Sequence, residues 1–199
     1  MRILAIGDIV AEDGREYVYN HLNRIRDQYR IDFCIANGEN AANTNGITMD
    51  IANTLIDRGV DVITMGNHTF SNRDAARVLD ENPSIIRPLN FPSELEGVGY
   101  VIKDTGTARI AVINLMGTAY MDPLDNPFTV IEEFLPTLPT KNIIVDFHAE
   151  ATAEKKAMGH FLTGKVSAVI GTHTHVQTAD EAILNHHTGY LTDVGMTGG

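Results

Sequence analysis

Short apolar runs alternate along this chain with longer segments whose apolar residues recur at helical spacing. Continuous apolar runs are typical of strands that are covered on both faces of a sheet. Five such strands are predicted, at residues 2–6, 33–36, 60–65, 142–147 and 166–170. We expect these strands to form a largely parallel, buried sheet, because helical segments separate them.

The segments between the strands carry the pattern of helices with one buried face. Val18, Leu22 and Ile25 show it clearly, in a helix expected over residues 14–28. Further helices are predicted at residues 48–58, 73–81, 126–135 and 152–162. Gly59 directly follows the second of these helices and is a common helix stop. Alternating strands and helices predict an α/β fold.

Two predicted hairpins add antiparallel strands. Their strands are expected at residues 98–103 with 109–115, and at residues 182–184 with 190–192. Turn-forming residues join each pair. We therefore expect either one mixed sheet or two packed sheets. No repeat or linker-like stretch interrupts residues 1–199, which predicts a single domain.

Composition and charge narrow the classes of function. The net charge of -11 disfavours stable nucleic-acid binding, although bound metals could still attract a small anion. No apolar segment approaches the roughly 20 residues that cross a bilayer, and the first apolar run is too short for a secretory signal. We therefore expect a cytoplasmic protein with no membrane partner. Cys34, the single cysteine, stands in an apolar run and is predicted to be a buried thiol.

Each of the five predicted strands is followed by polar residues that can bind a metal. They are Asp8, Glu39 with Asn40, Asn67 with His68, His148, and His173 with His175. Parallel strands bring their carboxyl ends to one edge of a sheet, where ligands bind. Gly7, Gly38 and Gly66 adjoin three of these positions and permit close backbone approach.

Any one of these residues by itself is more commonly a helix cap or a turn residue. The five strand ends together favour a metal centre, in which imidazole and carboxylate ligands suit a transition-metal pair and Glu39 could bridge. His173 and His175 are separated by one residue, so on an extended segment both would point the same way. His21, His160, His186 and His187 are predicted to be ordinary surface residues.

The segments Gly66-Asn67-His68 and Gly-Thr-His-Thr-His at residues 171–175 resemble those of the calcineurin-like metallophosphoesterases. Residues 36–42, 146–152, 171–180 and 192–198 narrow the resemblance to the YmdB-type bacterial phosphodiesterases. The resemblance covers essentially the whole chain. It implies a calcineurin-like metallophosphoesterase fold, with mixed β-sheets packed as a sandwich and flanked by helices. Relatives continue beyond the position of Gly199, so C-terminal strands of the second sheet are expected to be missing.

The resemblance also implies a set of roles. One metal would be held by Asp8, Glu39, Asn40 and His175, and Glu39 would bridge to a second metal held by Asn67, His148 and His173. Many relatives have a histidine where Val10 stands, and Asn40 would supply that ligand. His68 would be the catalytic proton donor. The implied cofactors are two divalent or transition metal ions, iron or manganese, and the implied assembly is a homo-oligomer.

The function predicted from these features is metal-dependent hydrolysis of a small phosphodiester, such as a 2',3'-cyclic nucleotide, by attack of a metal hydroxide. Two alternatives stay open: a phosphomonoesterase or nucleotidase, and a weakly active metal-binding regulatory protein. The chain departs from the usual family pattern at Ala11, at Phe70-Ser71 and at Thr118, where glycine, Trp-Asp and arginine are common. These positions affect loops and phosphate contacts, and all the proposed ligands are present.

Overall fold

The computed structural model describes residues 1–199, whose strands form three sheets. The first sheet has four parallel strands in the order β1, β3, β4, β5. Their bounds are β1 Ile3–Ile6, β3 Phe33–Asn37, β4 Val62–Thr64 and β5 Ile85–Ile86. A small sheet pairs β2 (Asp8–Ile9) in parallel with β12 (Met196–Thr197), so the end of the chain returns to the first predicted metal ligand.

The second large sheet is mixed and has six strands in the order β10, β11, β9, β8, β7, β6. Their bounds are β6 Tyr100–Asp104, β7 Arg109–Met116, β8 Ile143–His148, β9 Ala168–Thr172, β10 Ala182–Leu184 and β11 Thr188–Leu191. The central strands β7, β8 and β9 are parallel, and the two predicted hairpins provide the antiparallel pairs β6–β7 and β10–β11. The register places His148 beside Thr172.

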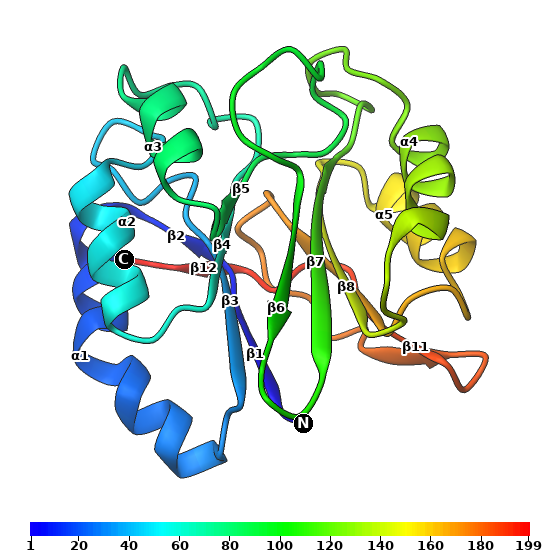
Figure 1. The fold of residues 1–199 in the computed structure, drawn as a ribbon, viewed down its shortest axis with the longest axis horizontal. Coiled ribbons are helices and arrows are strands. Elements are labelled where there is room, and N and C mark those ends of the chain that lie inside the picture. The colour runs from blue at the N-terminus through cyan, green and yellow to red at the C-terminus, as the bar shows by residue number, and fades with distance from the viewer.

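Helices cover the outer faces of the two large sheets (Figure 1). The helices α1 (Ala11–Tyr29), α2 (Met49–Asp57) and α3 (Ala75–Glu81) lie on the side of the four-stranded sheet. The helices α4 (Pro127–Phe134) and α5 (Thr152–Phe161) lie on the side of the six-stranded sheet, and a short 3₁₀ helix (Leu135–Thr137) follows α4. The prediction of mixed sheets packed as a sandwich with flanking helices is confirmed.

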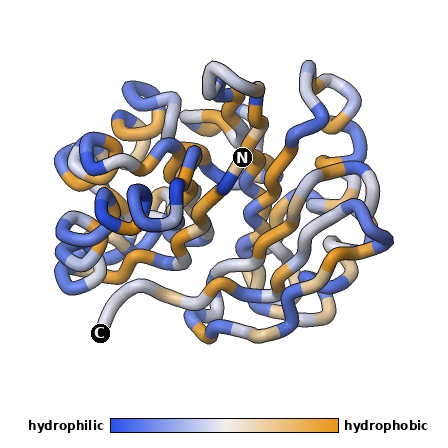
Figure 2. The backbone as a smooth tube through the Cα atoms, turned by 90° about the horizontal axis from the view of Figure 1, so that it is seen from below, coloured by the Kyte–Doolittle hydropathy of each residue, from blue (hydrophilic) through white to orange (hydrophobic).

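The alternation of side chains along β3 shows how the layers are held together. Phe33 and Ile35 face the other sheet and pack with Val112 and Ile144, whereas Cys34 packs towards the helices. Strands buried on both faces need apolar residues at every position, which is why the sequence shows unbroken apolar runs. In Figure 2 the hydrophobic segments gather along the strands, while hydrophilic positions lie on outer helical turns and loops. The predicted burial of Cys34 is confirmed.

The main departures from the sequence prediction lie at element boundaries. Helix α1 begins at Ala11 rather than Gly14, because its start is held by a distant contact: the Ala11 N–H donates to the Asn40 carbonyl over 2.9 Å. No side chain caps this helix, so no local signal marks its start. Strand β9 ends at Thr172, two residues later than predicted from the apolar run. The two-residue strands β2, β5 and β12 exist through pairing with distant strands and were not predicted.

None of the helices has the length and apolar character that crossing a membrane requires.

Candidate metal centre

The seven predicted metal ligands lie where the carboxyl ends of the two large sheets meet. Glu39 and Asn40 follow β3, Asn67 follows β4, and Asp8 begins β2 directly after β1. From the other sheet, His148 ends β8, and His173 and His175 follow β9. Hydrogen-bonding contacts link all seven side chains into two adjoining clusters.

The first cluster surrounds the Nε2 atom of His148. This nitrogen lies 2.9 Å from Oε1 of Glu39, 2.9 Å from Oδ1 of Asn67 and 3.1 Å from Nδ1 of His173. A ring nitrogen carries at most one proton, so it cannot satisfy three acceptors at once. Glu39 and His148 are both buried, which removes water as the alternative partner. Lone pairs that converge in this way fit a cation held among them.

The second cluster surrounds the side-chain amide of Asn40. Its Nδ2 atom lies 3.3 Å from Oδ1 of Asp8, 3.4 Å from Oε1 of Glu39 and 3.3 Å from Nε2 of His175. The amide oxygen and nitrogen of asparagine have nearly the same shape, so a half-turn of the amide offers Oδ1 to this space. Oε1 of Glu39 belongs to both clusters. This position is the one that a bridging carboxylate needs, and the donor set fits two cations.

The carboxylates and imidazoles of the two clusters compensate each other's charge. Burial disfavours ionised Asp8 and Glu39, but the adjacent imidazoles outweigh burial and lower the pKa of both carboxyl groups. Burial opposes the charged form of His148, but Glu39 outweighs it and raises the pKa of His148. The hydrogen bond to Asp8 raises the pKa of His175, whereas burial and the charge of His148 lower the pKa of His173. Cations at this centre would therefore compete with protons.

The backbone of the His173-Thr174-His175 segment differs from the prediction. The segment is not extended: strand β9 ends at Thr172, and φ is 96° at His173 and 63° at His175. Left-handed backbone is uncommon for residues other than glycine and is found where the surroundings enforce it. Both imidazoles still reach the centre, but His173 contacts His148 whereas His175 contacts Asp8. The expectation of an extended segment was wrong because tertiary contacts set the conformation.

Three residues that sequence reasoning missed support the histidines from behind. Nδ1 of His148 lies 2.9 Å from the Thr172 hydroxyl, which donates over 2.8 Å to Oδ1 of Asp146. A hydroxyl that donates to Asp146 accepts from His148, so Nδ1 carries the proton and Nε2 is free to bind a cation. Burial raises the pKa of Asp146 to about 6. The signal that could have revealed this support is Asp146, an acidic residue inside the apolar strand β8.

Glu150 plays the corresponding part for His173. Its Oε2 atom lies 3.1 Å from Nε2 of His173, the ring nitrogen that faces away from His148. Carboxylates commonly accept the second N–H of a metal-binding histidine and fix its ring orientation. Glu150 was part of the segment that carried the family resemblance, yet nothing in its local sequence distinguished it from a solvated acid.

Close packing at Gly66 explains why glycine precedes Asn67. A Cβ atom at this position would overlap both Nε2 of His148 and Oε2 of Glu39. Gly38 similarly leaves no room, because an added Cβ would come within 2.7 Å of Ile63. The predicted close backbone approach at these glycines is confirmed.

The side chain of His68 lies beside the two clusters rather than within them. Its backbone N–H donates to Oε2 of Glu39 over 2.8 Å, while its ring contacts Asn45 and Ser71 at 3.3–3.4 Å. The ring is partly accessible to solvent, and its hydrogen-bonding contacts are with Asn45 and Ser71 rather than with a predicted ligand. A place at the rim is compatible with proton donation to a leaving group, and this role stays a prediction.

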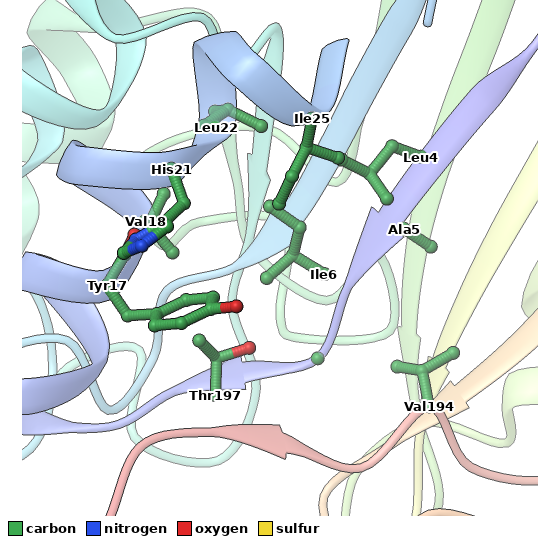
Figure 3. Close-up of a pocket in the computed structure, with 11 residues that line it drawn as sticks. Leu4, Ala5, Ile6, Tyr17, Val18, His21, Leu22, Ile25, Val194 and Thr197 are labelled. Carbon is green, nitrogen blue, oxygen red and sulfur yellow. The ribbon is translucent and has the colours of Figure 1, made fainter. Parts of the chain in front are cut away.

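The other histidines lie apart from the clusters. His160, His186 and His187 are exposed, as predicted. His21 is half-buried and stacks on Tyr17 with ring centroids 4.3 Å apart. Both rings line an apolar cavity of about 190 Å³ between α1 and β1 (Figure 3), whose lining includes none of the seven predicted ligands.

Comparisons with known proteins agree with the family resemblance of the sequence motifs. The family model described as YmdB-like protein matches residues 4–199. A 2',3'-cyclic-nucleotide 2'-phosphodiesterase of Bacillus subtilis (strain 168) is 46% identical over 200 residues, which cover 100% of this chain and 76% of the relative.

Two solved structures have the same fold. A hypothetical protein from Thermus thermophilus superposes with a TM-score of 0.95 at 43% identity, over 100% of this chain and 78% of that one. A novel phosphatase of Mycoplasma pneumoniae superposes with a TM-score of 0.90 at 36% identity, over 98% of this chain and 71% of that one. The fold, the full-length family match and these relatives together establish that the chain belongs to the YmdB-like family.

Proposed function

We propose that this protein is a phosphodiesterase that uses two metal ions to hydrolyse a small phosphodiester. The observation that carries the proposal is the position of Glu39, whose Oε1 atom belongs to both donor clusters. Two cations that share a carboxylate suit in-line displacement at phosphorus, because they neutralise charge on both the entering and the leaving oxygen. The B. subtilis relative, a 2',3'-cyclic-nucleotide 2'-phosphodiesterase, favours a 2',3'-cyclic nucleotide as the substrate.

Asp8, Asn40 and His175 would hold one cation, and Asn67, His148 and His173 the other, with Glu39 between them. When bound, such a pair supplies Lewis acidity and activates water at neutral pH. Imidazole together with oxygen ligands suits several transition metals, and among these the family resemblance favours iron or manganese as the metal.

The protein's own groups would orient the reaction. The Thr172–Asp146 pair keeps the proton of His148 on Nδ1. Glu150 fixes the orientation of the His173 ring. His68, at the rim, would donate a proton to the departing 2'-oxygen of the ribose. Asp8, Glu39 and His148 are buried, while His173 and His175 are partly exposed, so the centre is open on one side. A small phosphodiester fits this access better than a long polyanion, which the net charge of -11 repels.

A direct assay tests the proposal. Metal-free protein would be reconstituted with Mn²⁺ or, without oxygen, with Fe²⁺, and offered 2',3'-cyclic AMP, 3',5'-cyclic AMP, bis-nitrophenyl phosphate and nitrophenyl phosphate. We expect turnover of the diesters, opening of the 2',3'-ring at its 2'-oxygen, and loss of activity in His148→Ala but not in the surface control His160→Ala.

The same substrates separate the alternatives. Preference for the monoester would instead make the protein a phosphatase, the class named for the M. pneumoniae structure. Metal binding without turnover of any substrate would leave a regulatory role. We also propose a cytoplasmic location and a homo-oligomeric assembly. Sedimentation analysis tests the assembly.

A further inference from the structure

A buried ion pair lies directly behind the loop that carries His173 and His175. Lys155 of α5 and Asp193, which follows β11, are each about 1% exposed, and Nζ of Lys155 lies 2.6 Å from Oδ2 of Asp193. Nζ also donates to the carbonyl of Thr172 over 2.7 Å. None of the ligand roles proposed above uses either residue.

The carboxylate of Asp193 also holds the middle residue of the loop. Its Oδ2 atom accepts the Thr174 N–H over 3.2 Å and the Thr174 hydroxyl over 2.7 Å. Its Oδ1 atom accepts the Gly195 N–H over 2.8 Å. Thr174 is therefore held through both its backbone and its side chain, and it stands between His173 and His175, whose φ angles are both positive.

Burying a lysine and an aspartate together contributes little net stability, because desolvation offsets their attraction. The pair is therefore better explained by the geometry that it imposes. The uncommon backbone of the loop makes His173 contact His148 while His175 contacts Asp8, so the two imidazoles serve different clusters. An extended segment would instead send both side chains to the same side.

We propose that Lys155 and Asp193 are positioning residues, which hold Thr174 so that His173 and His175 each face a different cation position. The inference rests on the metal centre of the proposed function. It predicts that releasing Thr174 weakens metal binding although every ligand is still present.

Thr174→Val is the main test, because valine keeps the shape of threonine and leaves the ion pair intact but removes the hydroxyl donor. Isothermal titration of the metal-free protein with Mn²⁺ should show affinity lower by about ten- to a hundredfold, the usual effect of removing an outer-shell partner. Thr174→Ser keeps the hydroxyl and should bind as the wild type does. Thermal unfolding of metal-free Thr174→Ser should match that of the wild type. Thr174→Val should be folded but somewhat less stable, because the buried Asp193 carboxylate loses one donor.

Asp193→Asn tests the ion pair itself, and Asp61→Asn is its matched control. Asp61 pairs with Nη1 of Arg26 over 2.9 Å and accepts the Cys34 N–H at the start of β3, the opposite end of that strand from Glu39. Asp61→Asn should lower stability without changing Mn²⁺ affinity, whereas Asp193→Asn should lower both. If Asp193→Asn does not fold, the Mn²⁺ affinities of Thr174→Val and Thr174→Ser test the proposal by themselves.

Wild-type affinity and stoichiometry in Thr174→Val would overturn the proposal, as would a wild-type protein that binds no Mn²⁺. Failure of the proposed function has a different signature. A wild-type protein that binds Mn²⁺ but hydrolyses no phosphodiester would refute the proposed activity. The Mn²⁺ titrations of the variants would still test the positioning role.

Discussion

Glu39 is the side chain whose atoms connect the two donor clusters. Its Oε1 atom lies near His148 and Asn40, and its Oε2 atom accepts the His68 N–H. Because a bridging carboxylate lowers the repulsion between two cations, Glu39→Ala should weaken both metal positions together. Metal analysis after dialysis should find both ions reduced, whereas the exposed control Glu94→Ala should keep both. Full occupancy at one position with loss at the other would argue against a bridge.

His68 differs from the predicted ligands because its ring lies at the rim, against Asn45 and Ser71. We expect His68→Ala to keep its metals and to lose about 10²–10⁴-fold in turnover, the usual contribution of general acid catalysis. The loss should be smaller for substrates with a nitrophenolate leaving group, which needs little protonation. The control Ser71→Ala removes a neighbour of the ring and should change turnover little.

Rates on both substrate types, measured together with metal content, decide the role of His68. An equal loss on good and poor leaving groups at full metal occupancy would remove His68 from the acid role. Loss of metal in His68→Ala would instead show that the side chain supports the metal centre, since the backbone N–H that bonds Glu39 is kept.

At the scale of elements, β8 and β9 act together, because their register sets Thr172 beside His148. Thr172→Val would remove the hydroxyl that links His148 to Asp146. The buried Asp146 carboxyl would lose one donor, at a cost of about 1–3 kcal/mol in the free energy of unfolding. Metal affinity should also fall, by about 10–100-fold, because His148 loses the partner that fixes its proton.

Thr188→Val is the matched control for this change. Thr188 is a buried threonine on β11. Its hydroxyl donates to the Val166 carbonyl over 2.8 Å and accepts the Gly164 N–H over 2.9 Å, so its hydrogen bonds lie apart from the predicted ligands. Denaturant unfolding should show a loss of stability in both variants, whereas Mn²⁺ titration should show weaker binding in Thr172→Val alone. Equal metal affinities in the two variants would contradict the supporting role of Thr172.

At the scale of the whole molecule, the metal centre lies between the two large sheets, so the ionisation of its side chains affects the stability of the fold. His148 and His175 have pKa values raised above 6.5 in the folded protein. A group with a raised pKa contributes stability that is present below its unfolded value and is lost as the pH rises through its folded value. The lowered pKa of His173 affects stability only below pH 6.5. The lowered pKa values of Asp8 and Glu39 affect stability only below the ordinary pKa values of these groups, 3.8 and 4.5.

The melting temperature of metal-free protein should therefore fall as the pH is raised above 6.5. His175→Gln should make the fall shallower, and the surface control His160→Gln should not. With Mn²⁺ present the trend should reverse, because the cation displaces protons and binds better at higher pH. A melting temperature of the metal-free protein that does not change above this pH would contradict the prediction.

The α/β class, the five strands that lead to the centre and the polar residues at their ends could be predicted from the sequence pattern, while the family resemblance implied which seven of those residues are candidate ligands. These features are local: an apolar run predicts a buried strand, and a polar residue at its end is visible in the chain. Even the need for glycine at Gly66 could be inferred, since ligand-bearing turns require close backbone approach.

How those side chains are supported, and which backbone brings them into place, became clear only from the folded chain. The left-handed backbone of His173 and His175, the Thr172–Asp146 link and the Lys155–Asp193 pair all depend on segments that are distant in the sequence. The expectation of an extended segment was wrong for the histidine loop, where Thr174 bonds Asp193, a residue 19 positions away in the sequence. Side-chain spacing is a property of one segment, whereas charge pairing across the fold forms only when the two sheets and α5 pack together.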